Sequence, residues 1–186
     1  MVETLVLTLV IFVVIQTFIA QPYRVEQMSM ETTLEPDQYV LVDKLTPRFD
    51  PYKRGDIVVF NPPDAWTSQA NKTPFIKRII GIAGDTIEIK NGSVYVNGTK
   101  LNEPYLYEVD GEAQPTVAAS DPPRWKVPPG DLFVMGDHRQ SSSDSRTFGP
   151  INVTDVIGRA WLRYWPFDTF EILPTPTHPE LQAKAP

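Results

Sequence analysis

The 186-residue chain is long enough for one globular domain and an anchoring segment, but too short for two large domains. Its formal net charge of -6 argues against a role in binding nucleic acid, because contacts to phosphates need a basic surface. The chain has no cysteine, which excludes disulfides and thiolate zinc sites, and its two histidines are too few for a histidine-based metal cluster. We therefore expect no metal and no other cofactor.

Residues 1–22 are predicted to form a membrane anchor. A helix over this stretch, at ~1.5 Å per residue, would roughly cross a bilayer core of ~30 Å. A buried core helix is the ordinary alternative, but the stretch has no polar face. A cleavable signal peptide is the closer alternative. The bulky Phe18, two residues before Ala20, does not suit a cleavage site that needs small residues, so we expect a retained anchor.

Residues 23–172 are predicted to form one β-rich domain. The 19 prolines disfavour a helical bundle and favour strands joined by turns. The Asn-Gly pairs at 91–92 and 97–98 tolerate the positive φ of two-residue hairpin turns, and they predict a meander. The fold class expected is therefore mostly β and antiparallel. β-branched and aromatic residues predict strands at 38–43, 55–60, 75–80, 86–90, 93–96, 131–135 and 156–165.

Three further segments are predicted to lie outside regular strands. Residues 64–73 are polar and indicate a loop. Residues 103–124 are irregular, acidic and rich in proline, which indicates a surface excursion and not a second domain. Residues 173–186 combine prolines with an absence of apolar periodicity, so we expect a flexible Pro-rich tail.

Ser29 and Lys77 are the residues best suited to nucleophilic catalysis. A serine hydroxyl attacks an amide only when a base takes its proton. Lys77 lies in an apolar run, and strand alternation places it on one face with Phe75 and Ile79. Burial among apolar groups lowers a lysine pKa from about 10.4 by several units and makes it a usable base. The ordinary alternative is a lysine at a strand edge with its ammonium group in water.

A histidine base is the second candidate for this role. His138 follows Asp137 directly, but neighbouring residues on a strand point to opposite faces, which is poor geometry for an orienting pair. A lysine base instead needs an uncharged acceptor to aim its amine, and the serines at 141–143 offer hydroxyls. Asp144 and Arg146 can pair with each other and brace this segment. A polar surface loop is the ordinary reading of the same residues.

Four segments follow the apolar stretch in a fixed order: 29–34, 54–60, 77–85 and 136–146. Together they resemble the type I signal peptidases, which are membrane-anchored Ser/Lys endopeptidases. The likeness covers nearly the whole chain. It implies a serine endopeptidase that removes N-terminal signal peptides from exported preproteins, and that cleaves after small residues in an Ala-x-Ala pattern. It also implies an antiparallel β catalytic domain behind one transmembrane helix.

The resemblance assigns roles to individual residues. Ser29 would be the nucleophile and Lys77 the general base, while the hydroxyl of Ser142 would orient the lysine amine. Asp144 and Arg146 would form a bracing ion pair. Ser145 and Arg78 would support the site, and Met30 would pack beside it.

Three positions depart from the family pattern. Gln27 stands where many members have a serine whose hydroxyl helps to bind the oxyanion, and others have glycine. Losing one oxyanion donor can cost roughly 10²–10³ in rate, so Gln27 predicts a slower enzyme or a different second donor. Thr32 replaces a proline, which frees the turn after the nucleophile. His138 replaces a common asparagine, and both side chains can donate a hydrogen bond.

The resemblance also implies partners and a location. The expected partners are exported preproteins and membrane lipid, with no nucleic acid and no obligate protein partner. The expected place is the plasma membrane, with the catalytic domain on the extracytoplasmic face. Basic residues after the anchor, such as Arg24 and Lys44, would by themselves predict the opposite orientation.

Two alternatives differ in class from this reading. A self-cleaving Ser/Lys repressor-type peptidase is cytoplasmic and carries a DNA-binding domain, for which this chain has no room. A non-catalytic or degenerate membrane-tethered β-rich binding module is the other alternative, and it has no reason to keep Ser29, Lys77 and Ser142 together.

Overall fold

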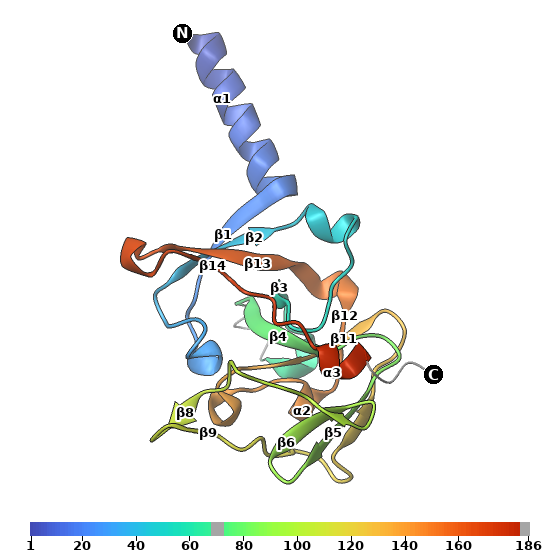
Figure 1. Ribbon diagram of the computed structural model, residues 1–186. Helices are drawn as coiled ribbons and strands as arrows, with labels where there is room; N and C mark the ends of the chain where they lie inside the picture. Colours follow the sequence, from blue (N-terminus) through green and yellow to red (C-terminus); the bar gives the residue numbers. More distant parts are fainter. Residues whose placement is uncertain (68–72, 183–186) are drawn as a thin grey trace.

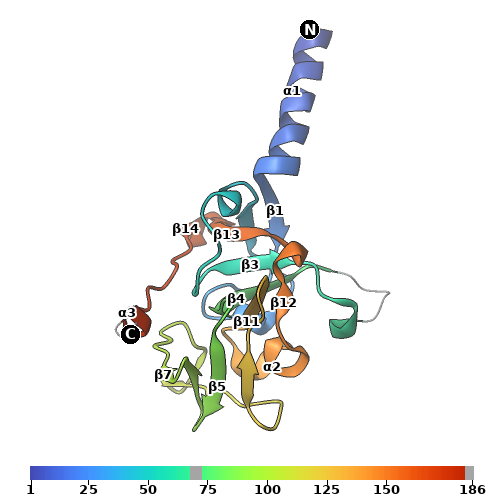
Figure 2. The same cartoon turned by 90° about the vertical axis from the view of Figure 1, so that its right-hand side faces the viewer.

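A computed structural model describes residues 1–67 and 73–182 as an N-terminal helix that projects from a β-rich body (Figures 1 and 2). The body contains an eight-stranded sheet, a four-stranded sheet and a two-stranded hairpin. Every strand pairing among the described residues is antiparallel. The predicted fold class, mostly antiparallel β with one N-terminal apolar helix, is confirmed.

The apolar helix leads directly into the main sheet. Helix α1 (Val2–Val14) continues through a π-helical turn (Ile15–Ile19) into strand β1 (Ala20–Arg24). The stretch from Val2 to Ile19 is long and apolar enough to cross a membrane, and no residue of α1 is buried. The helical part therefore ends three residues before the predicted boundary at 22, because the last residues of the expected anchor pair with the sheet.

The eight-stranded sheet combines strands from the N-terminal and the C-terminal parts of the β body. Its strand β4 (Phe75–Gly81) lies between β3 (Ile57–Phe60) and β11 (Asp131–Met135), so both of its edges are hydrogen-bonded. Strands β3 and β4 are buried along almost their whole length, which explains why they read as continuous apolar runs. In spatial order the strands are β1, β2 (Tyr39–Asp43), β13 (Val156–Trp165), β3 (Ile57–Phe60), β4 (Phe75–Gly81), β11 (Asp131–Met135) and β12 (Ile151–Asn152), and β14 (Glu171–Ile172) pairs with β13.

The four-stranded sheet contains the predicted meander. Asn91, Gly92, Asn97 and Gly98 all have positive φ, as the hairpin turns require. Both hairpins are therefore confirmed. The strands, in spatial order, are β10 (Arg124–Lys126), β5 (Thr86–Lys90), β6 (Ser93–Val96) and β7 (Thr99–Lys100).

The other helical segments of the described chain are short. Two are α-helical, α2 (Ser145–Phe148) and α3 (Pro179–Gln182). Six are single 3₁₀ turns: Met28–Met30, Thr46–Arg48, Asp64–Trp66, Arg139–Ser141, Val153–Asp155 and Phe167–Thr169.

The core consists of three apolar clusters around the central strands. Strand β3 contributes Ile57 and Val59 to one cluster, and Val58 and Phe60 to a second on its other face. A third cluster joins the four-stranded sheet to β11. Because β3 is covered on both faces, the neighbouring strand β4 can bury polar side chains deep within the body.

The segment 103–124 is a surface excursion with buried attachments. It carries the hairpin of β8 (Glu108–Val109) and β9 (Glu112–Ala113), whose residues are exposed. Tyr105 and Thr116, on either side of the hairpin, are 6% and 2% exposed. The excursion is therefore tied to the body at both ends.

Residues 173–182, which the sequence predicts to be part of a flexible tail, make contacts with the body in this structure. Leu173 packs into the first core cluster, and His178 is buried. The hydroxyl of Thr175 donates to Asp56 Oδ1 at 3.1 Å. Pro176 packs closely against Gly55. Prolines fix an extended path here, and the isolated Leu173 supplies the apolar contact that periodicity could not reveal. Residues 183–186 lie outside the described chain.

The predicted polar loop at 64–73 contains an aromatic anchor. Trp66 is 7% exposed and stacks on Phe148 at a centroid distance of 5.2 Å. No periodic pattern predicts this contact, because a single buried tryptophan in a loop does not produce one. Residues 68–72 of the loop lie outside the described chain.

Candidate active site

Ser29 lies in the 3₁₀ turn that follows β1. The residue is 3% exposed, and Met30 beside it is 1% exposed. Met30 and Leu34 both belong to the first core cluster, so apolar packing fixes the chain directly after Ser29. The supporting role that the family resemblance implies for Met30 stays a prediction.

Lys77 reaches Ser29 from the middle of the main sheet. Its Nζ lies 2.6 Å from Ser29 Oγ, although the two residues are 48 positions apart in the chain. The lysine is 1% exposed, and its Nζ lies 5.1 Å from the ring centroid of Phe75. The alternative of a lysine at a strand edge is wrong, because β4 is paired on both sides.

The surroundings of Lys77 change its acid–base behaviour. Burial disfavours the ammonium form and lowers the pKa of Lys77 from 10.5 to about 8, although Asp144 and Asp137 act in the opposite direction. At pH 7 roughly a tenth of such a group is neutral. A neutral amine at hydrogen-bonding distance from a serine hydroxyl can accept its proton.

Asp144 and Arg146 form the ion pair that the sequence predicts. Arg146 donates from Nε to Oδ1 and from Nη2 to Oδ2 of Asp144, both at 2.8 Å. Burial by itself would raise the pKa of Asp144, but the hydrogen bonds and charge of Arg146 lower it below the ordinary value. Asp144 also caps α2, since its Oδ1 accepts from Arg146 N. Ser145 is fully buried, and its Oγ accepts from Val134 N at 3.0 Å, which attaches this segment to β11.

Ser142 contacts Asp144 in this structure. Its hydroxyl donates to Asp144 Oδ2 at 2.7 Å, and no hydrogen bond joins it to Lys77 within the described residues. Gly136 separates Ser142 from the backbone of Ser29, and a Cβ at Gly136 would collide with both. Ser142 is therefore close to the nucleophile, while its role in orienting Lys77 stays a prediction.

Arg78 and Asp137 form a second buried ion pair, and the sequence did not identify Asp137 as the partner of Arg78. Arg78 donates from Nε to Asp137 Oδ1 at 2.9 Å and from Nη2 to Oδ2 at 2.7 Å. It also donates to Gly55 O at 2.8 Å. Because Arg78 follows Lys77 on β4, the two cations face different partners, as alternation predicts. The available signal for Asp137 was its position directly after a buried strand.

Arg139 is a further buried cation near the site. Its guanidinium group pairs with Glu103 and donates to Thr116 Oγ1. The side chain of Arg139 is fully buried, and that of Glu103 is 5% exposed. The catalytic segment is thereby connected to both ends of the excursion at 103–124, a link that no sequence pattern indicated.

The geometry excludes a Ser-His-Asp arrangement. His138 contacts Glu31 and Ser141, and Asp137 pairs with Arg78. The second histidine, His178, contacts Glu180. No hydrogen bond joins either imidazole to Ser29 in the part of the chain that is described. No group of three or more His, Asp or Glu residues suited to a metal occurs there either.

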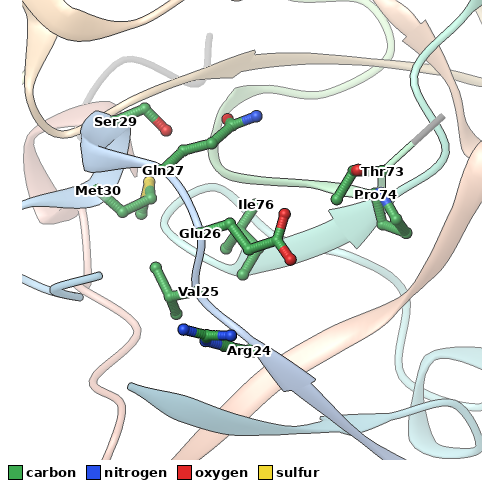
Figure 3. Close-up of a pocket in the computed structure, with 9 residues that line it drawn as sticks. All are labelled: Arg24, Val25, Glu26, Gln27, Ser29, Met30, Thr73, Pro74 and Ile76. Atoms are coloured by element: carbon green, nitrogen blue, oxygen red, sulfur yellow. The ribbon is translucent and has the colours of Figure 1, made fainter. Parts of the chain in front are cut away.

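A small pocket opens beside Ser29, between the end of β1 and the start of β4 (Figure 3). Its cavity volume of about 20 Å³ is close to that of one water-sized probe. Gln27 is exposed, and Figure 3 shows its side chain extending across the pocket toward Thr73 and Pro74. The amide of Gln27 makes no hydrogen bond to any described residue. The lining residues are Arg24, Val25, Glu26, Gln27, Ser29, Met30, Thr73, Pro74 and Ile76.

Comparison with known proteins gives consistent matches over most of the chain. A family model described as signal peptidase, peptidase S26, matches residues 1–165. Signal peptidase I of Bacillus caldolyticus is 40% identical over 163 residues, which cover 84% of this chain and 85% of that protein. Signal peptidase I of Leptolyngbya laminosa is 35% identical over 185 residues, covering 95% and 85%. A crystal structure of a signal peptidase I from Enterococcus faecalis, at 32% identity, covers 58% of this chain and 95% of that chain with a TM-score of 0.44, too loose a fit to carry an argument.

Proposed function

This chain belongs to the signal peptidase family, peptidase S26, and we propose that it removes N-terminal signal peptides from exported preproteins with Ser29 as nucleophile and Lys77 as general base. The observation that carries the assignment of the residues is the 2.6 Å contact between Lys77 Nζ and Ser29 Oγ. Both side chains are buried in the stretch that the family model matches.

The cleavage region of the preprotein would lie extended across the pocket between β1 and β4, with one small side chain in it. Backbone hydrogen bonds to such a segment give affinity without demanding a sequence. The small volume beside Ser29 favours small residues next to the scissile bond, as in Ala-x-Ala. Specificity would then come from exclusion of larger side chains.

The reaction has two halves. Ser29 Oγ attacks the scissile carbonyl carbon while Lys77 Nζ takes the hydroxyl proton. Lys77 returns this proton to the leaving amine as the C–N bond breaks, which leaves an ester on Ser29. A water molecule then attacks the ester with Lys77 as base, and the signal peptide carboxylate leaves as the serine hydroxyl is restored.

The oxyanion of each tetrahedral intermediate needs hydrogen-bond donors. We assign the backbone N–H of Ser29 as one donor and the side-chain amide of Gln27 as the other. The exposed amide lines the same pocket as Ser29 and has no partner among the described residues. A longer, flexible donor is less preorganised than a hydroxyl, so this site should work more slowly than one with a serine at position 27.

The remaining predicted residues would support the base. The Asp144–Arg146 pair holds the segment that carries Ser142, and Ser145 attaches it to β11. Ser142 would rotate its hydroxyl toward the Lys77 amine when substrate is bound.

The chain is membrane-anchored, and we place it in the plasma membrane with the catalytic domain on the extracytoplasmic face. Trp165, Phe167, Phe170 and Ile172 in the β13–β14 hairpin are 45–74% exposed. Both views place this hairpin at the end of the body nearest α1 (Figures 1 and 2). Exposed aromatic side chains there favour contact with membrane lipid, which is the second proposed partner beside the preprotein. We propose no obligate protein partner.

The test is cleavage of a preprotein in detergent by wild type, Ser29→Ala and Lys77→Ala. We expect cleavage after an Ala-x-Ala site by wild type, and a loss of at least about 10³-fold in each variant. Normal cleavage by folded Lys77→Ala would overturn the assignment of the base. Failure of folded wild type to cleave any preprotein would favour the binding-module alternative.

A further inference from the structure

Glu31 and His138 form a contact beside Ser29 that the proposed mechanism does not use. His138 Nδ1 lies 2.5 Å from Glu31 Oε2, and the two side chains are only 11% and 16% exposed. On the other side of the ring, Nε2 lies 3.2 Å from Ser141 Oγ. An Nδ1–H that donates to the carboxylate leaves Nε2 free to accept from the Ser141 hydroxyl. The ring thus connects the turn after the nucleophile with the segment that carries Ser142.

The turn after Ser29 has an unfavourable backbone. Thr33 N donates to Met30 O at 3.1 Å, and the two central residues, Glu31 and Thr32, have φ of -51° and 85°. These values define a type II turn, in which glycine usually occupies the second central position. A β-branched threonine rarely adopts positive φ. Such a conformation persists only where surrounding contacts hold it in place.

Asp137 and His138 hold this turn through contacts with Ser29, Glu31 and Thr33. His138 N donates to Ser29 O at 3.1 Å, and the His138 ring contacts Glu31. Thr33 Oγ1 donates to Asp137 Oδ2 at 2.6 Å. The contact between His138 and Glu31 is the middle one. It joins two side chains, whereas the contact at Ser29 joins two backbone groups. The contact at Thr33 also joins two side chains, but both of them contact the buried Arg78 as well. The contact between His138 and Glu31 is therefore the one that can be changed without breaking the Arg78–Asp137 pair.

The ring of His138 is itself fixed by a neighbour. It stacks on Tyr107 with a centroid distance of 4.0 Å and an interplanar angle of 10°. Tyr107 N donates to Asp137 O at 3.3 Å, and this hydrogen bond holds Tyr107 beside the segment that follows β11. The imidazole is therefore held flat between the excursion and the catalytic segment, with its two nitrogens directed at Glu31 and Ser141.

We propose that Glu31 and His138 form a positioning pair that holds Ser29 at hydrogen-bonding distance from Lys77. The proposal rests on the function proposed above. Neither side chain is assigned a contact with substrate or with the reacting atoms, so the pair acts through the turn. A displacement of a reacting group by ~1 Å can cost ~10²-fold in rate, so loss of the pair should lower kcat.

The test compares two substitutions at His138, one that keeps the stacking on Tyr107 and one that keeps a hydrogen-bond donor to Glu31. His138→Phe keeps the stacking on Tyr107 but removes both ring nitrogens. His138→Asn places an amide N–H near the position of Nδ1, where it can still donate to Glu31. We expect kcat for a signal-peptide substrate to fall about tenfold or more in the first variant, with KM changed less than about twofold. The second variant should recover most of this loss.

A coupled pair also predicts how substitutions combine. Glu31→Ala should lower kcat about as much as His138→Phe, and the double variant should be no slower than either single one. Losses that multiply in the double variant would mean that the residues act independently. The matched control is the second histidine–glutamate contact, His178 with Glu180, since His178→Phe should leave kcat unchanged.

Hydrogen exchange gives a readout that does not depend on cleavage. The amides of Glu31, Thr33 and Leu34 are hydrogen-bonded within the turn. Full-length His138→Phe should exchange them faster than wild type, while His138→Asn and His178→Phe should not. If wild type cleaves no substrate, the proposed function fails, and the exchange data still decide the pair. Unchanged exchange together with unchanged kcat in folded His138→Phe would overturn it, as would a loss confined to KM.

Discussion

At the scale of single residues, the proposed chemistry depends on one buried amine. Lys77 lies in the centre of a sheet, where its charge has little solvation. The same burial that costs stability makes the amine a usable base near neutral pH. Three predictions follow from particular side chains at the site.

The first prediction concerns pH. Since only neutral Lys77 can accept the proton, kcat/KM should rise as pH increases toward about 8 and level off above it, because burial lowers the pKa of Lys77 to about 8. Initial rates between pH 6 and 9.5 on a soluble peptide substrate would measure the profile. The exposed Lys90→Arg variant is the control and should follow the same curve. A kcat/KM that keeps rising up to pH 9.5 without levelling off, as the ordinary lysine pKa of 10.5 requires, would contradict the buried environment.

The second prediction is that Lys77→Met inactivates the protein and stabilises it. A lysine pKa lowered from 10.5 to about 8 corresponds to a cost of about 3 kcal/mol for the buried ammonium. This cost is fully present below pH 8 and disappears as pH rises toward 10.5, because the folded form is then neutral while the unfolded form still binds the proton. Denaturant unfolding at pH 7 should show the gain, reduced by the hydrogen bond lost at Ser29. Lys77→Ala, which leaves a cavity, should gain less, and a Met variant less stable than the Ala variant would contradict this account.

The third prediction concerns Gln27. If its amide supplies the second oxyanion donor, Gln27→Ala should lower kcat about 10²-fold with a smaller change in KM. Gln27→Ser, with a short hydroxyl beside Ser29, should retain or exceed the wild-type kcat. Steady-state kinetics on one peptide substrate separates the cases. Equal kcat for wild type and the Ala variant would show that the donor lies elsewhere.

At the scale of elements, strand β4 organises the site. Alternation sends Lys77 toward Ser29 and Arg78 toward Asp137, so one strand supplies both the proposed base and a buried brace. The excursion at 103–124 adds a second brace through Glu103, which pairs with the fully buried Arg139. The prediction at this scale concerns that pair.

Removing the carboxylate should destabilise the body strongly. Glu103→Ala leaves the guanidinium group of Arg139 buried without a counter-charge, and breaking such a pair typically costs about 3–5 kcal/mol. Glu88→Ala, which removes a contact with the exposed Lys90, should cost no more than about 1 kcal/mol. Thermal unfolding of both variants measures the difference. The double variant Glu103→Ala/Arg139→Met should recover part of the loss, and an effect of Glu103→Ala as small as that of Glu88→Ala would argue against the brace.

At the scale of the whole molecule, the anchor and the β body are joined through β1. Strand β1 begins at Ala20 and pairs with β2 along its whole length. Every strand of the sheet therefore lies outside the apolar helix. The body should therefore fold without residues 1–19, while the attachment to a membrane depends on them.

Deletion of residues 1–19 tests this division. We expect a soluble protein whose thermal midpoint lies within a few degrees of the full chain and whose kcat on a short soluble peptide is similar. Sedimentation with lipid vesicles should show that most of the membrane binding is lost. Undiminished binding would instead assign the attachment to the exposed Trp165 and Phe167 hairpin, and loss of folding would show that α1 contributes to the body.

The sequence by itself determined the elements and the family. Periodicity and turn chemistry are local, so the apolar helix, the central strands and both Asn-Gly hairpins could be predicted from neighbouring residues. Ordered motifs around Ser29 and Lys77 identified the family, which the comparisons confirm. The same local rules did not indicate the contacts of the segment 173–182, since a lone Leu173 that packs into a distant core cluster produces no periodic pattern.

Only the tertiary structure decided the geometry of the predicted contacts and the partners of the other buried charges. The contact between Lys77 and Ser29 joins residues 48 positions apart, and the Glu31–His138 contact spans 107. The partners of buried charges depend on how strands pair and which faces are covered, and a linear pattern does not encode these relations between distant segments. A sequence can therefore indicate that Lys77 is suited to be a base. The burial that lowers the pKa of Lys77, and the position of its Nζ next to Ser29, follow from the packing of β4 between β3 and β11.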